Sequence, residues 1–160
     1  MQAATLLLVV CALVGSCYAD GLPIKNCDNA NMLVESDITV FNSTWTCTQE
    51  PCPILKGKNI SVSITITNNG DDIPTLSNSV YGIIAGISVP FPGYPDTMRD
   101  VCTLGGTSST CPIKKGDKFT EKVVLPVIKE APSIQVVAKW EFMTSNKEVG
   151  CFEVELKITS

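Results

Sequence analysis

The chain has 160 residues and no histidine, and its 12 Lys or Arg against 16 Asp or Glu give a formal net charge of −4. An acidic chain without a basic cluster excludes nucleic acid as an expected partner, because such an interface needs a Lys/Arg surface to neutralise phosphates. The lack of histidine removes the commonest general base, the commonest zinc ligand and the usual pH switch.

The N-terminal segment is typical of a secretory signal peptide, with an apolar stretch over 5–15 followed by Ser16-Cys17-Tyr18-Ala19. Small residues stand three positions and one position before the expected cut after Ala19. The apolar stretch is shorter than the ~20 residues that a transmembrane helix needs. We therefore expect a signal peptide over 1–19 and one secreted domain over 20–160.

Apolar and polar residues alternate along three long segments of the mature domain, 60–67, 134–142 and 152–158. This alternation is typical of β-strands with one buried face and one mostly solvated face. Further strands are expected over 33–41, 80–89 and 119–125. The positions expected to face inward are Ile60, Val62, Ile64 and Ile66, then Ile134, Val136, Ala138, Trp140 and Phe142, then Phe152, Val154, Leu156 and Ile158.

Turn-forming residues separate these strands at 68–72, 105–109 and 144–147. Strands spaced by Gly, Asn and Pro turns imply an all-β fold, an antiparallel two-sheet β-sandwich in a single domain. Within the first turn, Asp71-Asp72 is interpreted as a polar turn, with a weak calcium site as the alternative.

Eight cysteines are present, two of them, Cys11 and Cys17, in the signal segment. The six that remain in a secreted domain predict a disulfide framework, for which fifteen pairings are open. A zinc site is disfavoured because no pair has the CxxC spacing. The spacing favours two local bridges and leaves one long bridge across the domain: Cys47–Cys52, Cys102–Cys111 and Cys27–Cys151.

No residue pattern predicts catalysis. Ser and Thr have no histidine to activate them as nucleophiles. The carboxylates of Glu153 and Glu155 fall on the polar face of an expected strand, where contact with solvent explains them. We therefore expect neither an enzyme nor a cofactor.

Two Asn-x-Ser/Thr sequons begin at Asn42 and Asn59. In a secreted chain such sequons are acceptors for N-linked glycans. We therefore expect a glycoprotein in which both positions face solvent.

The segment 86–95, Gly-Ile-Ser-Val-Pro-Phe-Pro-Gly-Tyr-Pro, contains three prolines. Because proline has no amide donor, this segment cannot be a central strand. It is expected to be a stiff edge or loop with Ile87, Val89 and Phe91 on one side. One interpretation is a rigid connection that caps the core, and the other is the rim of an apolar cavity, with 125–127 as the facing rim.

Several of these segments carry a family signature, and the chain resembles the ML (MD-2-related lipid-recognition) family, within it the Niemann–Pick type C2 group. The resemblance covers essentially the whole mature chain and includes the order of the six cysteines. The matching motifs are Cys-Pro-Ile-Leu-Lys-Gly at 52–57, Gly-Ile-Ser-Val-Pro-Phe-Pro at 86–92, Cys-Pro-Ile-Lys-Lys-Gly at 111–116, Leu-Pro-Val at 125–127 and Pro-Ser-Ile-Gln-Val-Val-Ala-Lys-Trp at 132–140.

The resemblance implies an immunoglobulin-like sandwich that binds a sterol between its sheets, with the same three disulfides. It places Phe91 and Val127 at the pocket mouth, with Val89 and Pro126 beside them. It places Trp140 deeper, along the inward face of Ile134, Val136 and Ala138. The loop Ile84-Ala85-Gly86-Ile87 is expected to meet a membrane surface or a sterol-accepting membrane protein.

One position departs from the family pattern, because sterol binders of the family commonly carry a tyrosine where this chain has Ala131. The missing ring should widen the entrance, so a fatty acid, phospholipid, glycolipid or semiochemical is an alternative ligand, in innate immunity or chemosensation. A structural sandwich with a filled core is a third interpretation. The expected protein is a monomer that acts outside the cell, with the lysosome lumen as the other candidate location.

Overall fold

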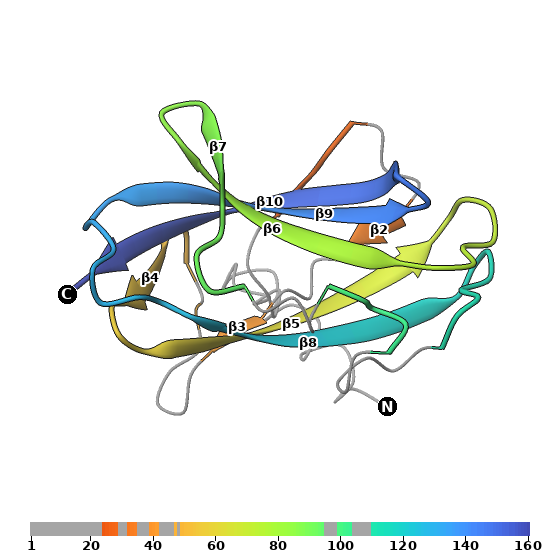
Figure 1. The fold of residues 1–160 in the computed structure, drawn as a ribbon, viewed down its shortest axis with the longest axis horizontal. Helices are drawn as coiled ribbons and strands as arrows, with labels where there is room; N and C mark the ends of the chain where they lie inside the picture. The colour runs from red at the N-terminus through yellow and green to blue at the C-terminus, as the bar shows by residue number, and fades with distance from the viewer. Residues whose placement is uncertain are drawn as a thin grey trace, which may run out of the picture.

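The structure is a computed structural model in which two β-sheets pack face to face as a sandwich (Figure 1). The predicted immunoglobulin-like all-β fold is therefore confirmed. Within the described part of the chain, no helix is long and apolar enough to span a membrane. The residues that the structure describes are 24–28, 32–34, 39–41, 47, 49–94, 99–103 and 110–160.

The first sheet is built around β10, the last strand of the chain. Its order is β1 (Lys25–Asn26), β10 (Lys147–Thr159), β9 (Gln135–Thr144), β6 (Ser77–Ile84) and β7 (Ile87–Pro90), with β4 (Cys52–Leu55) also paired to β10. β1 and β4 share one edge of β10, since β1 pairs antiparallel at Phe152 and Glu153 and β4 pairs parallel from Leu156 onward.

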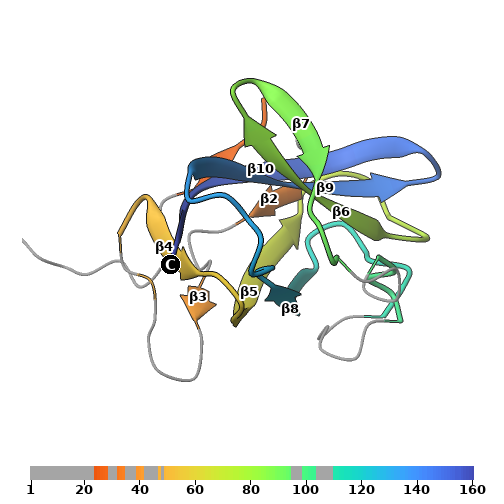
Figure 2. The ribbon, with the colours of Figure 1, turned by 60° about the vertical axis from the view of Figure 1, so that its left-hand side comes forward.

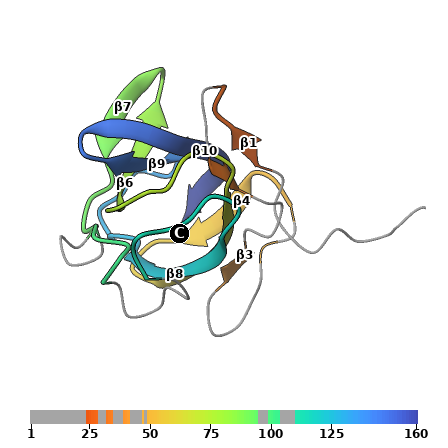
Figure 3. The same cartoon turned by 90° about the vertical axis from the view of Figure 1, so that its right-hand side faces the viewer.

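The second sheet has β5 (Asn59–Asn68) at its centre. β8 (Lys118–Pro126) pairs with one edge of β5, and β2 (Met32–Val34) and β3 (Thr39–Phe41) pair with the other edge. Seen end-on, the strands β6, β9 and β10 form one layer and β5 and β8 form the other (Figure 3).

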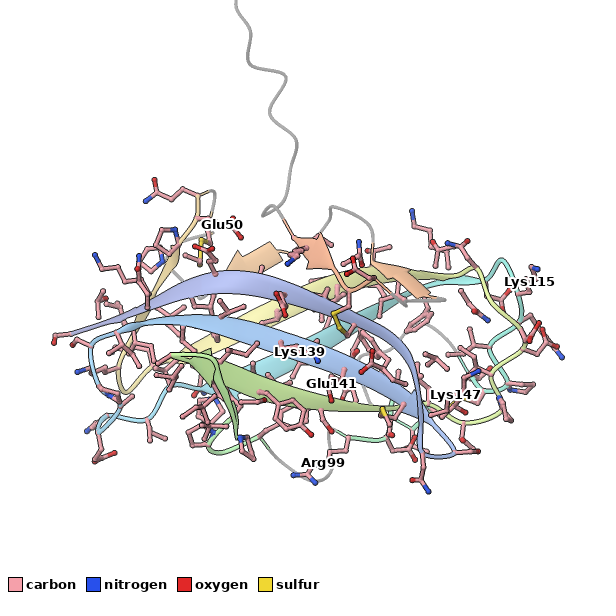
Figure 4. All side chains as sticks on the ribbon, turned by 90° about the horizontal axis from the view of Figure 1, so that it is seen from above. Glu50, Arg99, Lys115, Lys139, Glu141 and Lys147 are labelled. Carbon is pink, nitrogen blue, oxygen red and sulfur yellow. A yellow bond between two sulfur atoms is a disulfide. The ribbon has the colours of Figure 1, made fainter. Side chains whose placement is uncertain are left out.

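Alternating burial along the long strands confirms the expected inward faces. On β5 the four apolar residues are at most 2% exposed, and on β9 Ala138, Trp140 and Phe142 are equally buried. The Trp140 ring stacks on Phe152 of the neighbouring strand, with ring centroids 5.5 Å apart. The outward face of β9 carries charge instead, where Lys139 and Glu141 form an ion pair of 2.6 Å (Figure 4).

The structure corrects two of the expected strands. Segment 80–89 is not one strand, because the chain turns at Ala85 (φ 50°) and Gly86 (φ 80°) to make the β6–β7 hairpin. A two-residue hairpin turn needs positive φ at both positions, which glycine supplies freely and alanine rarely adopts, so the sequence signal was weak. Segment 33–41 contains two strands, β2 and β3, rather than one.

The remaining turns follow their sequence chemistry. Ser145 and Asn146 both have positive φ, and they form the tight turn between β9 and β10, as expected for 144–147. The predicted turn at 105–109 lies outside the described residues.

The turn after β5 is organised by the buried side chain of Asn68. Its amide nitrogen donates to the carbonyls of Asp71, Ile113 and Lys114, at 2.9, 3.3 and 3.2 Å, and its Oδ1 accepts from the Gly70 amide. Asp72 pairs with Lys114 at 2.8 Å, and this hydrogen bond lowers the pKa of Asp72. The polar-turn interpretation therefore holds, and the described residues contain no cluster of three or more His, Cys, Asp or Glu that could hold a metal ion.

Three disulfides link the sandwich, and all three predicted pairings are confirmed. Cys27–Cys151, Cys47–Cys52 and Cys102–Cys111 have Cα–Cα distances of 5.3, 5.8 and 5.4 Å. The first joins β10 to the start of the described chain across a sequence separation of 124 residues. Figure 4 draws disulfides as yellow bonds.

Candidate lipid-binding site

The proline-rich segment forms an edge, as its sequence predicts. Among the described strands β7 pairs with β6 alone, with Ile87 opposite Ile84 and Val89 opposite Gly82. The chain then continues to Phe91, whose amide donates to the Val80 carbonyl at 2.9 Å. Ile87, Val89 and Phe91 therefore share one side of the segment, the side that continues the inward face of the first sheet.

The two proline-marked segments, 89–93 and 125–127, lie against each other and are called here the rim segments. A Cβ atom added to Gly93 would lie 3.0 Å from Cγ of Pro126, so the backbone approaches this ring closely. Val127 is held by two backbone hydrogen bonds, from its amide to the Lys58 carbonyl and from the Gly57 amide to its carbonyl. This contact brings the two segments together, as a pair of facing rims requires.

Beside Val89 of the first rim segment, β6 and β9 carry small residues on the inward face of the first sheet. Gly82 of β6 stands opposite Ala138 of β9, so neither strand fills this stretch with a large side chain. A Cβ at Gly82 would come within 3.1 Å of Cγ2 of Val136. Trp140, one inward position further along β9, is 2% exposed and closes this stretch.

The predicted lining residues divide into an inner and an outer group. Val127, Ala138 and Trp140 belong to the buried core, and the half-buried Phe91 and Val136 pack against it. The outer group comprises the half-buried Pro126, Ala131 and Ile134 and the exposed Val89. Ala131 lies in the connection from β8 to β9, where its amide donates to the Ile128 carbonyl at 3.3 Å.

The hollows on the surface are small or charged. One of about 160 Å³ lies at the first rim segment, lined by residues that include Phe91, Tyr94 and Arg99. Another of about 290 Å³ lies beside β1 and β10 and has a mixed lining, with the charged residues Lys25, Glu50, Glu153 and Glu155 beside Ile24, Val137 and Val154. Because sites for drug-sized ligands usually enclose roughly 300–1,000 Å³, a lipid can enter at the rim only if the segments there move apart.

The tip of the β6–β7 hairpin is apolar and exposed. Ile84 is 39% exposed and Ile87 is 67% exposed, on either side of the Ala85-Gly86 turn. The hairpin projects away from the body of the sandwich (Figures 1 and 2). Exposed apolar side chains at a projecting tip are typical of surfaces that contact a membrane or another protein.

Comparison with known proteins agrees with this architecture. A family model described as the ML domain matches residues 21–158. The chain belongs to the ML domain family.

Two relatives named NPC intracellular cholesterol transporter 2 align over nearly their whole lengths. The protein of Mus musculus is 36% identical over 159 residues, covering 99% of this chain and 97% of its own. That of Bos taurus is 31% identical over 164 residues, covering 99% of both chains.

A solved structure shares the ML domain fold. The Niemann-Pick type C2 protein from Japanese carpenter ant superposes with a TM-score of 0.72 at 24% sequence identity. The match covers 86% of this chain and 100% of the ant protein.

This ML domain also contains a buried polar network that sequence reasoning missed. Glu121 of β8 is 0% exposed, and one of its carboxylate oxygens accepts a hydrogen bond from the Asn78 amide of β6 in the other sheet. Asn78 in turn accepts a hydrogen bond from the Tyr94 hydroxyl. Burial raises the pKa of Glu121 to about 8, and the Asn78 hydrogen bond opposes part of this shift. The signal was available, because Glu121 occupies an inward position between Phe119 and Val123.

The predicted glycosylation sites differ in what the structure describes of them. Asn59, the first residue of β5, is exposed, as a glycan acceptor must be. Asn42 lies outside the described residues.

Proposed function

We propose that this ML domain is a secreted carrier that binds a cholesterol-like sterol between its two sheets and transfers it to membranes or to a sterol-accepting partner protein. Family membership and the near full-length alignment with relatives named cholesterol transporters support this function. The observation that carries it is the contact between the two apolar rim segments, beside the small inward residues Gly82 and Ala138.

Uptake begins at the rim. The first rim segment begins within the edge strand β7, so it can move without breaking hydrogen bonds to a further strand on its outer side. Separation of Phe91 from Val127 admits the apolar body of the lipid, and the polar end that enters last stays near water. A sterol of about 28 heavy atoms at about 0.3 kcal/mol per atom gains about 8 kcal/mol, which corresponds to micromolar affinity. Such an affinity allows both extraction and release.

Delivery uses the apolar hairpin tip. Ile84 and Ile87 are exposed where they can enter a membrane interface or dock on a partner protein. The sequence isoelectric point of about 4.8 means that the negative charge of the chain disappears in an acidic compartment. Repulsion from anionic membranes then disappears as well, which favours transfer at acidic pH.

A second function, carriage of an acyl lipid, is favoured by Ala131. Its methyl group leaves the connection beside the second rim segment without an aromatic ring. A wider entrance suits a fatty acid or phospholipid better than a rigid sterol.

Competition binding tests both functions. The mature, disulfide-bonded protein is titrated with dehydroergosterol, and cholesterol, a fatty acid and phosphatidylinositol serve as competitors. Saturable binding that cholesterol displaces, and that Phe91→Ala weakens at least tenfold, supports the sterol carrier. Val124→Ala is the matched control, because Val124 is 43% exposed on the opposite side of β8 from the interior. Displacement by the acyl lipids alone moves the function to the second candidate.

A further inference from the structure

Three buried side-chain polar atoms have no hydrogen-bond partner among the described residues. Two of them, Glu121 Oε2 and Trp140 Nε1, belong to the buried interior, and the third, Thr144 Oγ1, lies at the far end of β9. An unpaired polar group in a protein interior costs about 1–3 kcal/mol, so a stable fold that keeps two of them needs a reason.

The Glu121 carboxyl is fixed in one orientation. Its Oε1 accepts from Asn78, and the Asn78 amide is itself fixed by the hydrogen bond from Tyr94. Asn78 and Tyr94 are 1% and 9% exposed, so water does not replace these contacts easily. The second oxygen, Oε2, is therefore held in place and left available inside the sandwich.

Both unpaired atoms are hydrogen-bond donors. The indole nitrogen of Trp140 only donates. Burial keeps the Glu121 carboxyl protonated up to its raised pKa of about 8, and its proton resides on Oε2 because Oε1 already accepts from Asn78. The interior therefore contains two unpaired donors, which an uncharged hydrogen-bond acceptor on a ligand would satisfy.

Glu121 lies far from the second rim segment along its strand. Glu121 is five residues before Pro126, the last residue of β8, which corresponds to about 16 Å along a strand. Trp140 pairs with Val80 on β6, whose carbonyl also accepts from the Phe91 amide, so Trp140 stands level with the first rim segment. Asn78 is the next inward residue of β6 beyond Val80. A lipid that enters between the rim segments therefore passes Trp140 and reaches Glu121 with the end that enters first.

We propose that Glu121, held by Asn78 and Tyr94, forms with Trp140 a polar subsite that selects lipids carrying a neutral oxygen, a hydroxyl or carbonyl, on the end that enters first. This inference rests on the proposed binding of a lipid between the sheets. Such a subsite would prefer a lipid other than cholesterol, because the end of cholesterol that enters first is a hydrocarbon chain.

Matched pairs of ligands test the subsite. The first pair is cholesterol and a cholesterol hydroxylated at the end of its side chain, and the second is hexadecanol and hexadecane diol with a hydroxyl at each end. In each pair only the leading end differs. Satisfying one buried donor is expected to strengthen binding of the hydroxylated member about tenfold in at least one pair.

Two substitutions identify the group that is responsible. Glu121→Leu removes the donor and is expected to abolish the preference or reverse it toward the unhydroxylated member. Glu121→Gln retains an N–H donor and is expected to keep a preference. If Glu121→Leu does not fold, infrared spectroscopy of the wild type gives a second test. The carbonyl band of the protonated Glu121 carboxyl is identified by its absence in Glu121→Gln. This band is expected to shift only when the hydroxylated ligand binds.

The outcomes separate the two proposals. Equal binding of both members in every pair that binds, or a carbonyl band that does not move on binding, overturns the subsite and leaves the lipid carrier standing. Failure of all four ligands to bind overturns the proposed function and the subsite together.

Discussion

The buried carboxyl of Glu121 makes stability fall as the pH rises. Its pKa is raised from 4.5 to about 8 by burial, so in this interval the folded chain holds a proton that the unfolded chain releases. The contribution is fully present below pH 4.5 and is lost as the pH rises toward 8. At 1.36 kcal/mol per pKa unit, this one group lowers the free energy of unfolding by about 3 kcal/mol between pH 5 and pH 8.

Glu121→Gln keeps the shape of the side chain and removes its titration. The free energy of unfolding of the wild type is therefore expected to fall by about 3 kcal/mol more than that of the variant when the pH is raised from 5 to 8. Guanidinium unfolding of both proteins at the two pH values, with the disulfides intact, measures this difference. Tyr94 does not interfere, because burial raises its pKa further above this range.

The matched control is Glu130→Gln, at an exposed position in the connection from β8 to β9. Its pH profile is expected to follow that of the wild type. Parallel profiles for wild type and Glu121→Gln would refute the reasoning, since they would mean that the carboxyl does not keep its proton in the folded protein.

Three further predictions follow from the fold and the hairpin. Replacing Cys27 and Cys151 by alanine should lower the free energy of unfolding by about 5 kcal/mol, through the lost constraint on the unfolded chain; an unchanged guanidinium midpoint would contradict this. Asn68→Ala should lower the free energy of unfolding, measured by thermal denaturation, by about 2–3 kcal/mol, because buried carbonyls lose their shared donor. A loss below about 1 kcal/mol would contradict this role of Asn68. Ile87→Asp should slow lipid transfer to liposomes severalfold without changing the melting temperature, whereas unchanged transfer would remove the hairpin tip from delivery.

The long strands could be predicted because their burial is local and periodic. The four inward positions of β5, from Ile60 to Ile66, can be read directly from the alternation. The disulfides followed from spacing and from the family pattern. The hairpin at Ala85 escaped prediction because nothing in an alanine marks a left-handed conformation.

The polar network could be only half predicted. The position of Glu121 in its strand indicates that it faces inward, but its partner Asn78 lies 43 residues away and comes from the other sheet. Periodicity within one strand carries no information about which residue of the opposite sheet stands across from it. The parallel pairing of β4 with β10 was unforeseen for the same reason, since residues 52 and 156 meet only in the folded sheet.

The place of β10 in the first sheet has a consequence for biosynthesis. β1, β4 and β9 all pair with this strand, yet β10 follows all three of them in the sequence. A growing polypeptide therefore carries these strands without their neighbour until residues 147–159 have been synthesised, and the first sheet assembles only afterwards. During that interval unpaired strand edges are open to association with other chains. A product that lacks β10 would thus have no way to complete the first sheet.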